Sequence, residues 1–498
     1  MRTWNLAIPL DASREPPLFA QLADGIAEAI RTGRLEPGAA LPGTRTVAAA
    51  LGVNRNTVVA AYDELVAQGL VAARGGAGSF VAAVPRTPRP PAMPTGMPTY
   101  ALPPSKIAAP FTPPPSAGKL ALHTGLPDAR LFPARELARA FRRAVARRRL
   151  DHADPRGHPA LRRELASMLA QTRALAVTPQ TLMTTRSVEQ AIDLVVRCLV
   201  APGDVVAVEA FGYPPAWRLF ALAGARLAPL PVDAEGLDID ALETLIEQGP
   251  VRAVFLTPHH QFPTTAVMSP ARRARLAQLA LTRRFAIVED DYDHEFHYDG
   301  RPVLPIAAGA GSANTIYIGS LANLLAPGVA TAFVTAPAPV FERLAWLRAA
   351  SDARGDLALE AAVAELYDDG ALMRHVRRAR GIYAARRDAL VAALRRRVGS
   401  ALTVRVPAGG LALWVRAADD IDVVAWERDA YAQGVVFHNA QPFDFHGREQ
   451  RYLRLGFGCH DAAELDEAAR RMAAALPRAR SVPVGMASPR DRAIAASA

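Results

Sequence analysis

Apolar positions near the start of the chain recur at the spacing of an α-helix. The first such run predicts a helix that ends near Gly33, and its buried face comprises Leu18, Leu22, Ile26 and Ile30. A second, shorter helix is predicted over residues 44–51, because Gly52 follows it as a stop signal. These spacings indicate a small helical domain.

A third helix is predicted directly after this stop. Asn54 is a suitable N-cap, Gly69 ends the pattern, and the inner face comprises Val58, Ala61, Tyr62 and Leu65. Residues 70–74 and 79–83 then read as two strands around a glycine hairpin. Two short helices joined by a glycine-containing turn and followed by such a hairpin predict a winged helix-turn-helix.

A different pattern follows residue 119, where short β-rich runs alternate with helical stretches. The runs cover residues 204–209, 251–258, 285–291, 315–320 and 331–337. Such alternation predicts an α/β domain with a mostly parallel sheet covered by helices. A helix over 373–394, followed by strand-like segments, predicts a smaller α+β subdomain at about 373–478.

Proline content separates these two regions. Residues 83–118 hold 12 of the 41 prolines and show no apolar period, which predicts an extended, partly polyproline linker. We therefore expect a winged-helix domain at 1–82, the linker at 83–118, a large domain at 119–478, and a loose tail at 479–498.

Composition and charge narrow the classes of protein. The 498 residues are 50% apolar, enough for large cores, and the net charge of +10 favours an anionic partner such as nucleic acid. The first residues lack the apolar run of a signal peptide, and no stretch has about 18 uninterrupted apolar residues. A cytoplasmic location without a membrane partner is expected.

Cysteine and lysine are both scarce. Cys198 and Cys459 have no histidine or cysteine at ligand spacing around them, so neither a disulfide framework nor a metal site is expected. Of the 58 lysines and arginines, only Lys106 and Lys119 are lysines. No lysine follows residue 119.

The start of the third helix carries the candidate DNA-binding residues. Side chains at this end of a recognition helix reach base edges and phosphates in the major groove. Arg55 can bind guanine or a phosphate, and the other candidates are Asn54, Asn56 and Thr57. The expected partner is a double-stranded DNA operator.

Three further residues extend this candidate surface. Arg45 lies where the preceding helix would cross the DNA backbone, and Arg74 with Gly76 in the wing can approach the minor groove. Any one of these arginines could equally be a solvated surface residue. The ordered set favours DNA binding.

The segment from Gly33 to Val81 resembles the winged helix of GntR-type bacterial regulators. The rest of the chain resembles fold-type I aminotransferases in several segments, among them residues 125–133, 154–166, 201–214, 257–264 and 288–305. A winged helix, a long linker and an aminotransferase-like domain form the arrangement of the MocR family. The resemblance implies a DNA-binding transcriptional regulator.

The aminotransferase resemblance also implies a pyridoxal phosphate site. It assigns Asp290 to the pyridine nitrogen, Tyr292 to the ring oxygen, and Tyr213 to stacking near the ring. Arg454 matches the arginine that binds the substrate carboxylate, and Ser320 belongs to the turn that carries the reactive lysine.

The same resemblance implies that essential cofactor contacts are missing. Asn323 stands at the position of the Schiff-base lysine, and its amide cannot form an imine. Ala330 stands where an arginine grips the phosphate, and Thr265 stands where glycine is usual. His152 replaces a tyrosine that reaches toward the phosphate.

The predicted phosphate cup is changed as well. Relative to the family, Ser187 replaces a glycine, Val188 removes a hydroxyl or small contact, and Glu189 places a carboxylate beside the site of the phosphate dianion. Electrostatics at this position oppose phosphate binding.

These residues predict a MocR-type regulator whose aminotransferase-like domain serves dimerisation and effector sensing, without catalysis and without covalent pyridoxal phosphate. The expected effector is a small carboxylate or an amino acid bound at Arg454. Two alternatives stay open. The domain could bind pyridoxal phosphate non-covalently, or it could be an active aminotransferase that uses another lysine, of which Lys119 is the candidate. A third open point is Arg454, which could instead form a salt bridge within the small subdomain.

Overall fold

The computed structural model describes residues 8–11, 15–74, 78–82, 115–122, 125–147, 154–329, 331–352 and 355–479. Gly76, His152 and Ala330, most of the predicted linker and nearly all of the predicted tail lie outside these residues. Contacts within the chain divide it into two compact units, residues 1–104 and 105–498.

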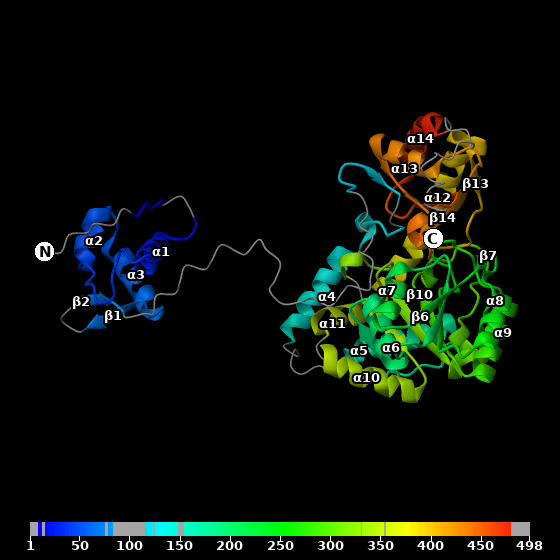
Figure 1. Ribbon diagram of the computed structural model, residues 1–498, viewed down its shortest axis with the longest axis horizontal. Coiled ribbons are helices and arrows are strands. Elements are labelled where there is room, and N and C mark those ends of the chain that lie inside the picture. The colour runs from blue at the N-terminus through cyan, green and yellow to red at the C-terminus, as the bar shows by residue number, and fades with distance from the viewer. Residues whose placement is uncertain are drawn as a thin grey trace, which may run out of the picture. The chain divides into compact units, whose positions relative to one another are not determined.

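The first unit has the predicted winged helix. Its helices are α1 (Leu18–Arg31), α2 (Thr44–Leu51) and α3 (Arg55–Ala67), and its wing is the antiparallel pair β1 (Val71–Arg74) and β2 (Gly78–Val81) (Figure 1). Gly52, with a φ of 67°, ends α2 in the left-handed conformation that glycine adopts without strain. The predicted inner face of α3 is buried against α1 and α2.

A seven-stranded sheet organises the second unit. Its order is β4-β12-β11-β10-β9-β5-β6, and only β12 runs antiparallel to its neighbours. The strands are β4 (Leu182–Thr185), β5 (Val205–Glu209), β6 (Arg226–Leu230), β9 (Ala253–Leu256), β10 (Ala286–Asp291), β11 (Thr315–Ser320) and β12 (Ala332–Thr335). The prediction of a mostly parallel sheet is therefore confirmed.

Helices cover both faces of this sheet, as Figure 1 shows. Successive residues of β10 point to opposite faces, so Val288 packs with α6 (Val188–Leu199), α7 (Pro214–Leu222) and α10 (Ala338–Asp352), whereas Ile287 packs with α8 (Ile239–Gln248) and α9 (Pro270–Arg283). This alternation explains the continuous apolar runs that mark the central strands. A further core joins α4 (Ala134–Ala146), α5 (Pro159–Arg173) and α11 (Leu357–Asp368).

The smaller subdomain is built on a four-stranded antiparallel sheet. Its order is β13 (Leu402–Val404), β14 (Ala412–Ala417), β17 (Tyr452–Gly456) and β16 (His438–Asn439). The long helix α12 (Ala371–Arg397) packs with α13 (Val423–Ala432) and α14 (Ala462–Ala479) in its core. A separate parallel pair joins β3 (Leu120–Ala121) to β15 (Val435–Val436), so residues close after the linker belong to this subdomain as well. Two short strands, β7 (Val232–Asp233) and β8 (Gly236–Leu237), form a hairpin.

Within the described part of the chain, no helix is both long enough and apolar enough to cross a membrane.

Candidate functional sites

The candidate DNA-binding residues lie on exposed parts of the winged helix. The Asn54 side chain accepts a hydrogen bond of 2.8 Å from the Asn56 backbone N–H, which confirms the predicted N-cap of α3. Arg55 and Asn56 are exposed, and Thr57 is half-buried. Arg55 Nε lies 3.4 Å from Thr44 Oγ1, which joins the start of α3 to the start of α2.

The remaining two described candidates lie on α2 and β1. Arg45 is exposed on the first turn of α2, and Arg74 is exposed at the end of β1, with its guanidinium 5.0 Å from the centre of the Phe80 ring. These side chains are free to contact an anionic backbone. A helix N-terminus with flanking arginines can bind phosphates and read base edges.

In the second unit, the predicted cofactor residues meet at the carboxyl ends of β10 and β11. Asp290 pairs in register with Ile318, so Tyr292 and Ser320 follow at the same edge of the sheet. Ser320 is buried, and its hydroxyl accepts a hydrogen bond of 3.1 Å from the Ala322 N–H. Asn323 Nδ2 donates to the Tyr292 carbonyl at 3.2 Å, so the structure brings these predicted residues together.

Asp290 is a buried carboxyl group with an unused oxygen. It is 3% exposed, and its Oδ1 has no hydrogen-bond partner. Burial raises the pKa of this carboxyl well above its ordinary value, and the neighbouring Asp291 and Glu189 raise it further. A cationic N–H group that donated a hydrogen bond to this oxygen would supply the missing partner and lower the pKa of the carboxyl again.

Glu189 and Tyr213 are hydrogen-bonded to each other. Ser187 caps α6 by accepting from the Gln190 N–H, and Glu189 lies in the first turn of that helix. The Tyr213 hydroxyl donates to Glu189 Oε1 at 2.5 Å. Burial opposes ionisation of Glu189, but hydrogen bonds from Tyr213 and Ser187 bring the pKa of its carboxyl below the ordinary value. The N-terminus of α6 therefore already has a negatively charged side chain, that of Glu189, in its first turn.

Arg454 is buried without a carboxylate partner. It lies on β17 with 5% exposure, its Nε has no hydrogen-bond partner, and it forms no ion pair with the residues that the structure describes. Burial lowers the pKa of its guanidinium, although Tyr292 and Asp293 oppose this. Gly125 makes room for it, because a Cβ at this position would lie 2.5 Å from Arg454 Nη1. The salt bridge that the sequence left open is absent among the described residues.

Phe262 was not predicted as a site residue, yet it joins these groups. The Arg454 guanidinium lies 4.7 Å from the centre of the Phe262 ring. The same ring meets Tyr213 edge to face at 5.5 Å and Tyr292 at 6.2 Å. It therefore contacts both Arg454 and Tyr213, the hydrogen-bond partner of Glu189. Residues 257–264, which contain it, carry part of the aminotransferase resemblance, but that resemblance gives the phenylalanine no role.

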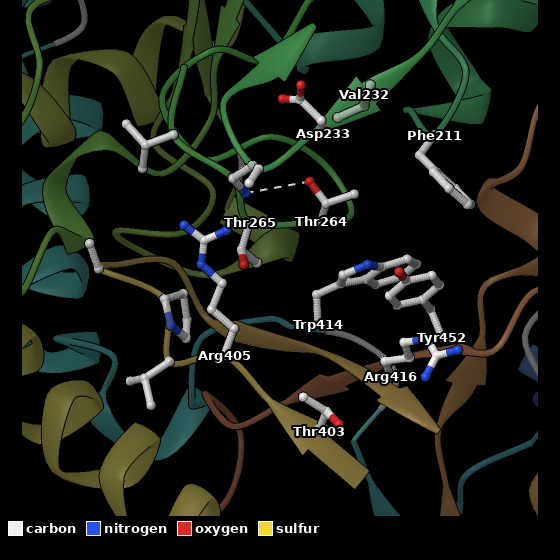
Figure 2. Close-up of a pocket in the computed structure, with 16 residues that line it drawn as sticks. Phe211, Val232, Asp233, Thr264, Thr265, Thr403, Arg405, Trp414, Arg416 and Tyr452 are labelled. Atoms are coloured by element: carbon white, nitrogen blue, oxygen red, sulfur yellow. Dashed lines mark hydrogen bonds between the residues drawn. The ribbon is translucent and has the colours of Figure 1, made fainter. Parts of the chain in front are cut away.

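A groove of about 520 Å³ lies next to β14 and β17 of the small subdomain. Figure 2 shows the rings of Trp414 and Tyr452 stacked along one side of it and Arg405 reaching toward Thr265. The two rings are 5.2 Å apart and nearly parallel. Thr265 has a φ of 62°, the left-handed region, which a β-branched residue rarely adopts.

Lys119, the only lysine that the structure describes, lies in the small subdomain. Its Nζ is 4.6 Å from the centre of the Tyr431 ring of α13, and its backbone N–H bonds to Ser116. The contacts of Asn323, by contrast, are with Tyr292 at the end of β10.

Comparison with known proteins identifies both units. Residues 18–81 match the family described as bacterial regulatory proteins, gntR family, and residues 118–472 match aminotransferase class I and II. The probable rhizopine catabolism regulatory protein MocR of Rhizobium meliloti is 32% identical over 497 residues, covering 98% of this chain and 99% of that protein. The pyridoxine biosynthesis regulator PdxR of Corynebacterium glutamicum is 30% identical over 388 residues, covering 77% of this chain and 80% of that protein.

A solved structure supports the fold of the second unit. The α-aminoadipate aminotransferase LysN of Thermus thermophilus, complexed with N-(5'-phosphopyridoxyl)-L-leucine, superposes with a TM-score of 0.67 and 29% identity, covering 72% of this chain and 92% of that chain. Together with the full-length similarity to the regulator from Rhizobium meliloti, these matches show that the chain belongs to the MocR family of regulators, in which a GntR-type winged helix is joined to an aminotransferase class I and II domain.

Proposed function

We propose that this MocR-type regulator binds its operator through the start of α3 and the wing, and that its aminotransferase-like unit binds a small carboxylate effector without covalent pyridoxal phosphate. Catalysis is not part of this proposal. The observation that carries it is the buried Arg454, which has no ion pair among the described residues, in a chain where Asn323, whose amide cannot form an imine, stands at the Schiff-base position.

DNA binding is assigned to Arg45, Asn54, Arg55, Asn56, Thr57 and Arg74, together with Gly76 of the wing. The exposure of Arg45, Arg55 and Arg74 supports the assignment, because phosphate contacts need accessible cations. The capped helix start supports it as well, since the cap holds Arg55 at the first position of α3.

A gel-shift assay tests this assignment. We expect the full chain to bind a duplex from upstream of its own gene at low salt, and Arg55→Ala to weaken binding by about 1–3 kcal/mol. Arg139→Ala is the matched control, because it removes one exposed arginine from the other unit. Absence of binding by the unchanged chain, or equal weakening by both substitutions, would contradict the assignment.

The residues gathered at the ends of β10 and β11 and at the start of α6 fit pyridoxal phosphate at its ring end only. The unpaired Oδ1 of Asp290 suits the N–H of a pyridinium ring, and a bound ring there would relieve the buried acid. At the other end, the ionised Glu189 would repel a phosphate dianion. Lys119 is engaged with Tyr431, so it does not support a surrogate linkage. The whole cofactor therefore does not fit, and we derive no reaction step through it.

Absorbance titration with pyridoxal phosphate tests the loss of covalent binding. We expect neither the unchanged chain nor Asn323→Lys to keep the cofactor after dialysis, because the phosphate end repels it in both. Glu189→Gln combined with Asn323→Lys should bind more tightly than Asn323→Lys alone, since it removes that repulsion. If the unchanged chain kept the cofactor after dialysis, and borohydride made that attachment permanent, the proposal would be contradicted. The alternative of an active aminotransferase would then be supported.

Non-covalent binding of a pyridine vitamer is a second candidate, favoured by the unused oxygen of Asp290. If the ring end alone is intact, pyridoxine should raise the melting temperature at least as much as pyridoxal phosphate does. An Asp290→Asn variant should lose that shift. A larger effect of the phosphorylated compound would exclude this candidate.

A further inference from the structure

Four histidines gather at the carboxyl ends of two neighbouring strands. His259 and His260 follow β9, whereas His294 and His297 lie in and just after the short 3-10 helix η2 (His294–Phe296) that follows β10. Because β9 and β10 are parallel and adjacent, with Leu256 opposite Glu289, the segments after them meet. None of these histidines has a role in the function proposed above.

Three of the rings present nitrogens to one another. His260 Nε2 and His297 Nδ1 are 3.5 Å apart, and the His259 ring centre lies 4.3 Å from that of His260. One nitrogen from each of the three lies within 4.8 Å of the others. A zinc ion bound at about 2.0–2.1 Å by tetrahedral imidazoles holds their nitrogens about 3.3 Å apart. Small side-chain rotations would therefore close the set around one ion.

His259 lacks the contacts expected of a structural histidine. It is 3% exposed, yet neither ring nitrogen has a hydrogen-bond partner, and His297 Nε2 is also unpartnered. Buried polar side chains in folded proteins almost always have at least one partner. A ligand that accepts a nitrogen lone pair would supply the missing interaction.

The surroundings orient these rings for such a ligand. Asp293 Oδ1 lies 2.7 Å from His260 Nδ1, which reserves Nε2 of the same ring for a second partner, as in carboxylate–histidine–metal arrangements. The His297 backbone pairs with Gly409. Gly409 leaves space beside the ring, because a Cβ there would lie 2.4 Å from His260 Nε2.

The cluster is also reachable. His294 and His297 line a cavity of about 260 Å³ whose wall includes Glu295 and Arg380. His297 is only half-buried, so a hydrated ion can reach the rings, and a water can remain as the fourth ligand.

We propose that His259, His260 and His297 bind one divalent transition-metal ion, for which Zn²⁺ is the best match in ligand type and geometry. The other trio, His259, Asp291 and His294, is less suited. Asp291 already accepts the Tyr317 hydroxyl at 2.5 Å and lies 3.8 Å from the Arg173 guanidinium, whose charge repels a cation. The ion would join the segments after β9 and β10.

Metal binding by the tag-free full chain tests this site. We expect one equivalent of Co²⁺, added as its chloride to metal-free protein, to give the visible absorption of a tetrahedral site and to be displaced by one equivalent of Zn²⁺. His297→Gln should weaken binding by at least about tenfold, and Asp293→Asn by about 10- to 100-fold through loss of the orienting carboxylate. His297 is half-buried, so its replacement is the least disruptive to folding.

Two control variants distinguish the proposed site from the other trio and from histidines outside the cluster. His446→Gln, outside the cluster, should leave metal affinity unchanged, and so should His294→Gln. No stoichiometric binding by the unchanged chain at about 1 μM free metal would overturn the proposal. Binding that survives His297→Gln but is lost in His294→Gln would overturn it in favour of the other trio.

Discussion

At the scale of single residues, Arg454 is a buried guanidinium whose Nε has no hydrogen-bond partner. A guanidinium loses its hydration on burial, and an ionised partner ordinarily compensates this loss. Arg454 has the Phe262 ring and Tyr292 beside it but no ion pair among the described residues. A ligand carboxylate would supply the missing ionised partner, which is why we propose Arg454 as its binding residue.

Replacing Arg454 should therefore weaken carboxylate binding. Arg454→Met keeps most of the volume and removes the charge, so the loss of a charge-assisted pair of about 1.5–3 kcal/mol should weaken amino-acid binding about 10- to 100-fold. Calorimetric titration with a panel of amino acids measures this. Amines of the same shape without the carboxylate serve as control ligands. Equal binding by both proteins would contradict a role for Arg454.

At the scale of elements, Glu209 links two strand ends. It ends β5, is 2% exposed, and accepts hydrogen bonds from the Thr257 N–H at 3.1 Å and the Thr257 hydroxyl at 3.0 Å. Burial raises the pKa of its carboxyl to about 8, although these hydrogen bonds oppose the shift. The folded chain therefore holds a proton here that the unfolded chain releases near pH 4.5.

This difference makes stability depend on pH. Between about pH 4.5 and pH 8, the folded state binds more protons than the unfolded state, so the free energy of unfolding should fall as pH rises. Glu209→Gln keeps the acceptor oxygen without the titration and should remove on the order of 5 kcal/mol of that fall.

Urea unfolding from pH 5 to pH 9 measures the effect. The exposed Glu247→Gln is the matched control and should keep the slope of the unchanged chain. If Glu209→Gln also keeps that slope, Glu209 is not the responsible group.

The individual elements also show which parts of the fold could be predicted from the sequence. The apolar runs of β9, β10 and β11 and the cap at Asn54 are local signals, and each was confirmed. The strands β4 and β6 were missed, because "LMTT" has two polar residues and "RLAPL" contains a proline.

Some candidate site residues could likewise be predicted from local motifs, whereas others depend on the tertiary structure. Asp290, Tyr292, Ser320 and Asn323 were found because they stand in recognisable motifs, and the structure brings them to one sheet edge. The histidine cluster and the position of Phe262 depend on which strands are neighbours. The adjacent pair His259–His260 and the i,i+3 pair His294–His297 were visible signals, but only the pairing of β9 with β10 joins them.

At the scale of the whole molecule, we expect a homodimer, because aminotransferase folds build their clefts at a two-fold interface and a dimer matches a two-half-site operator. Trp346 on α10 is 80% exposed, and tryptophan is enriched in interfaces. Sedimentation should give twice the chain mass of 53.1 kDa at micromolar concentration.

The Arg55→Ala variant is the control for this measurement. It should keep the dimer mass while losing DNA affinity, since dimerisation is assigned to the second unit. A mass of one chain across the concentration range would contradict the expectation and would require each operator half-site to be bound independently.

The pairing of β3 with β15 has a mechanical consequence. The chain leaves the linker and within a few residues is hydrogen-bonded into the same subdomain that carries Arg454 on β17. The strand that follows the linker and the guanidinium that we assign to the effector therefore belong to one subdomain. We expect any movement of this subdomain on effector binding to be shared by Leu120 and Ala121.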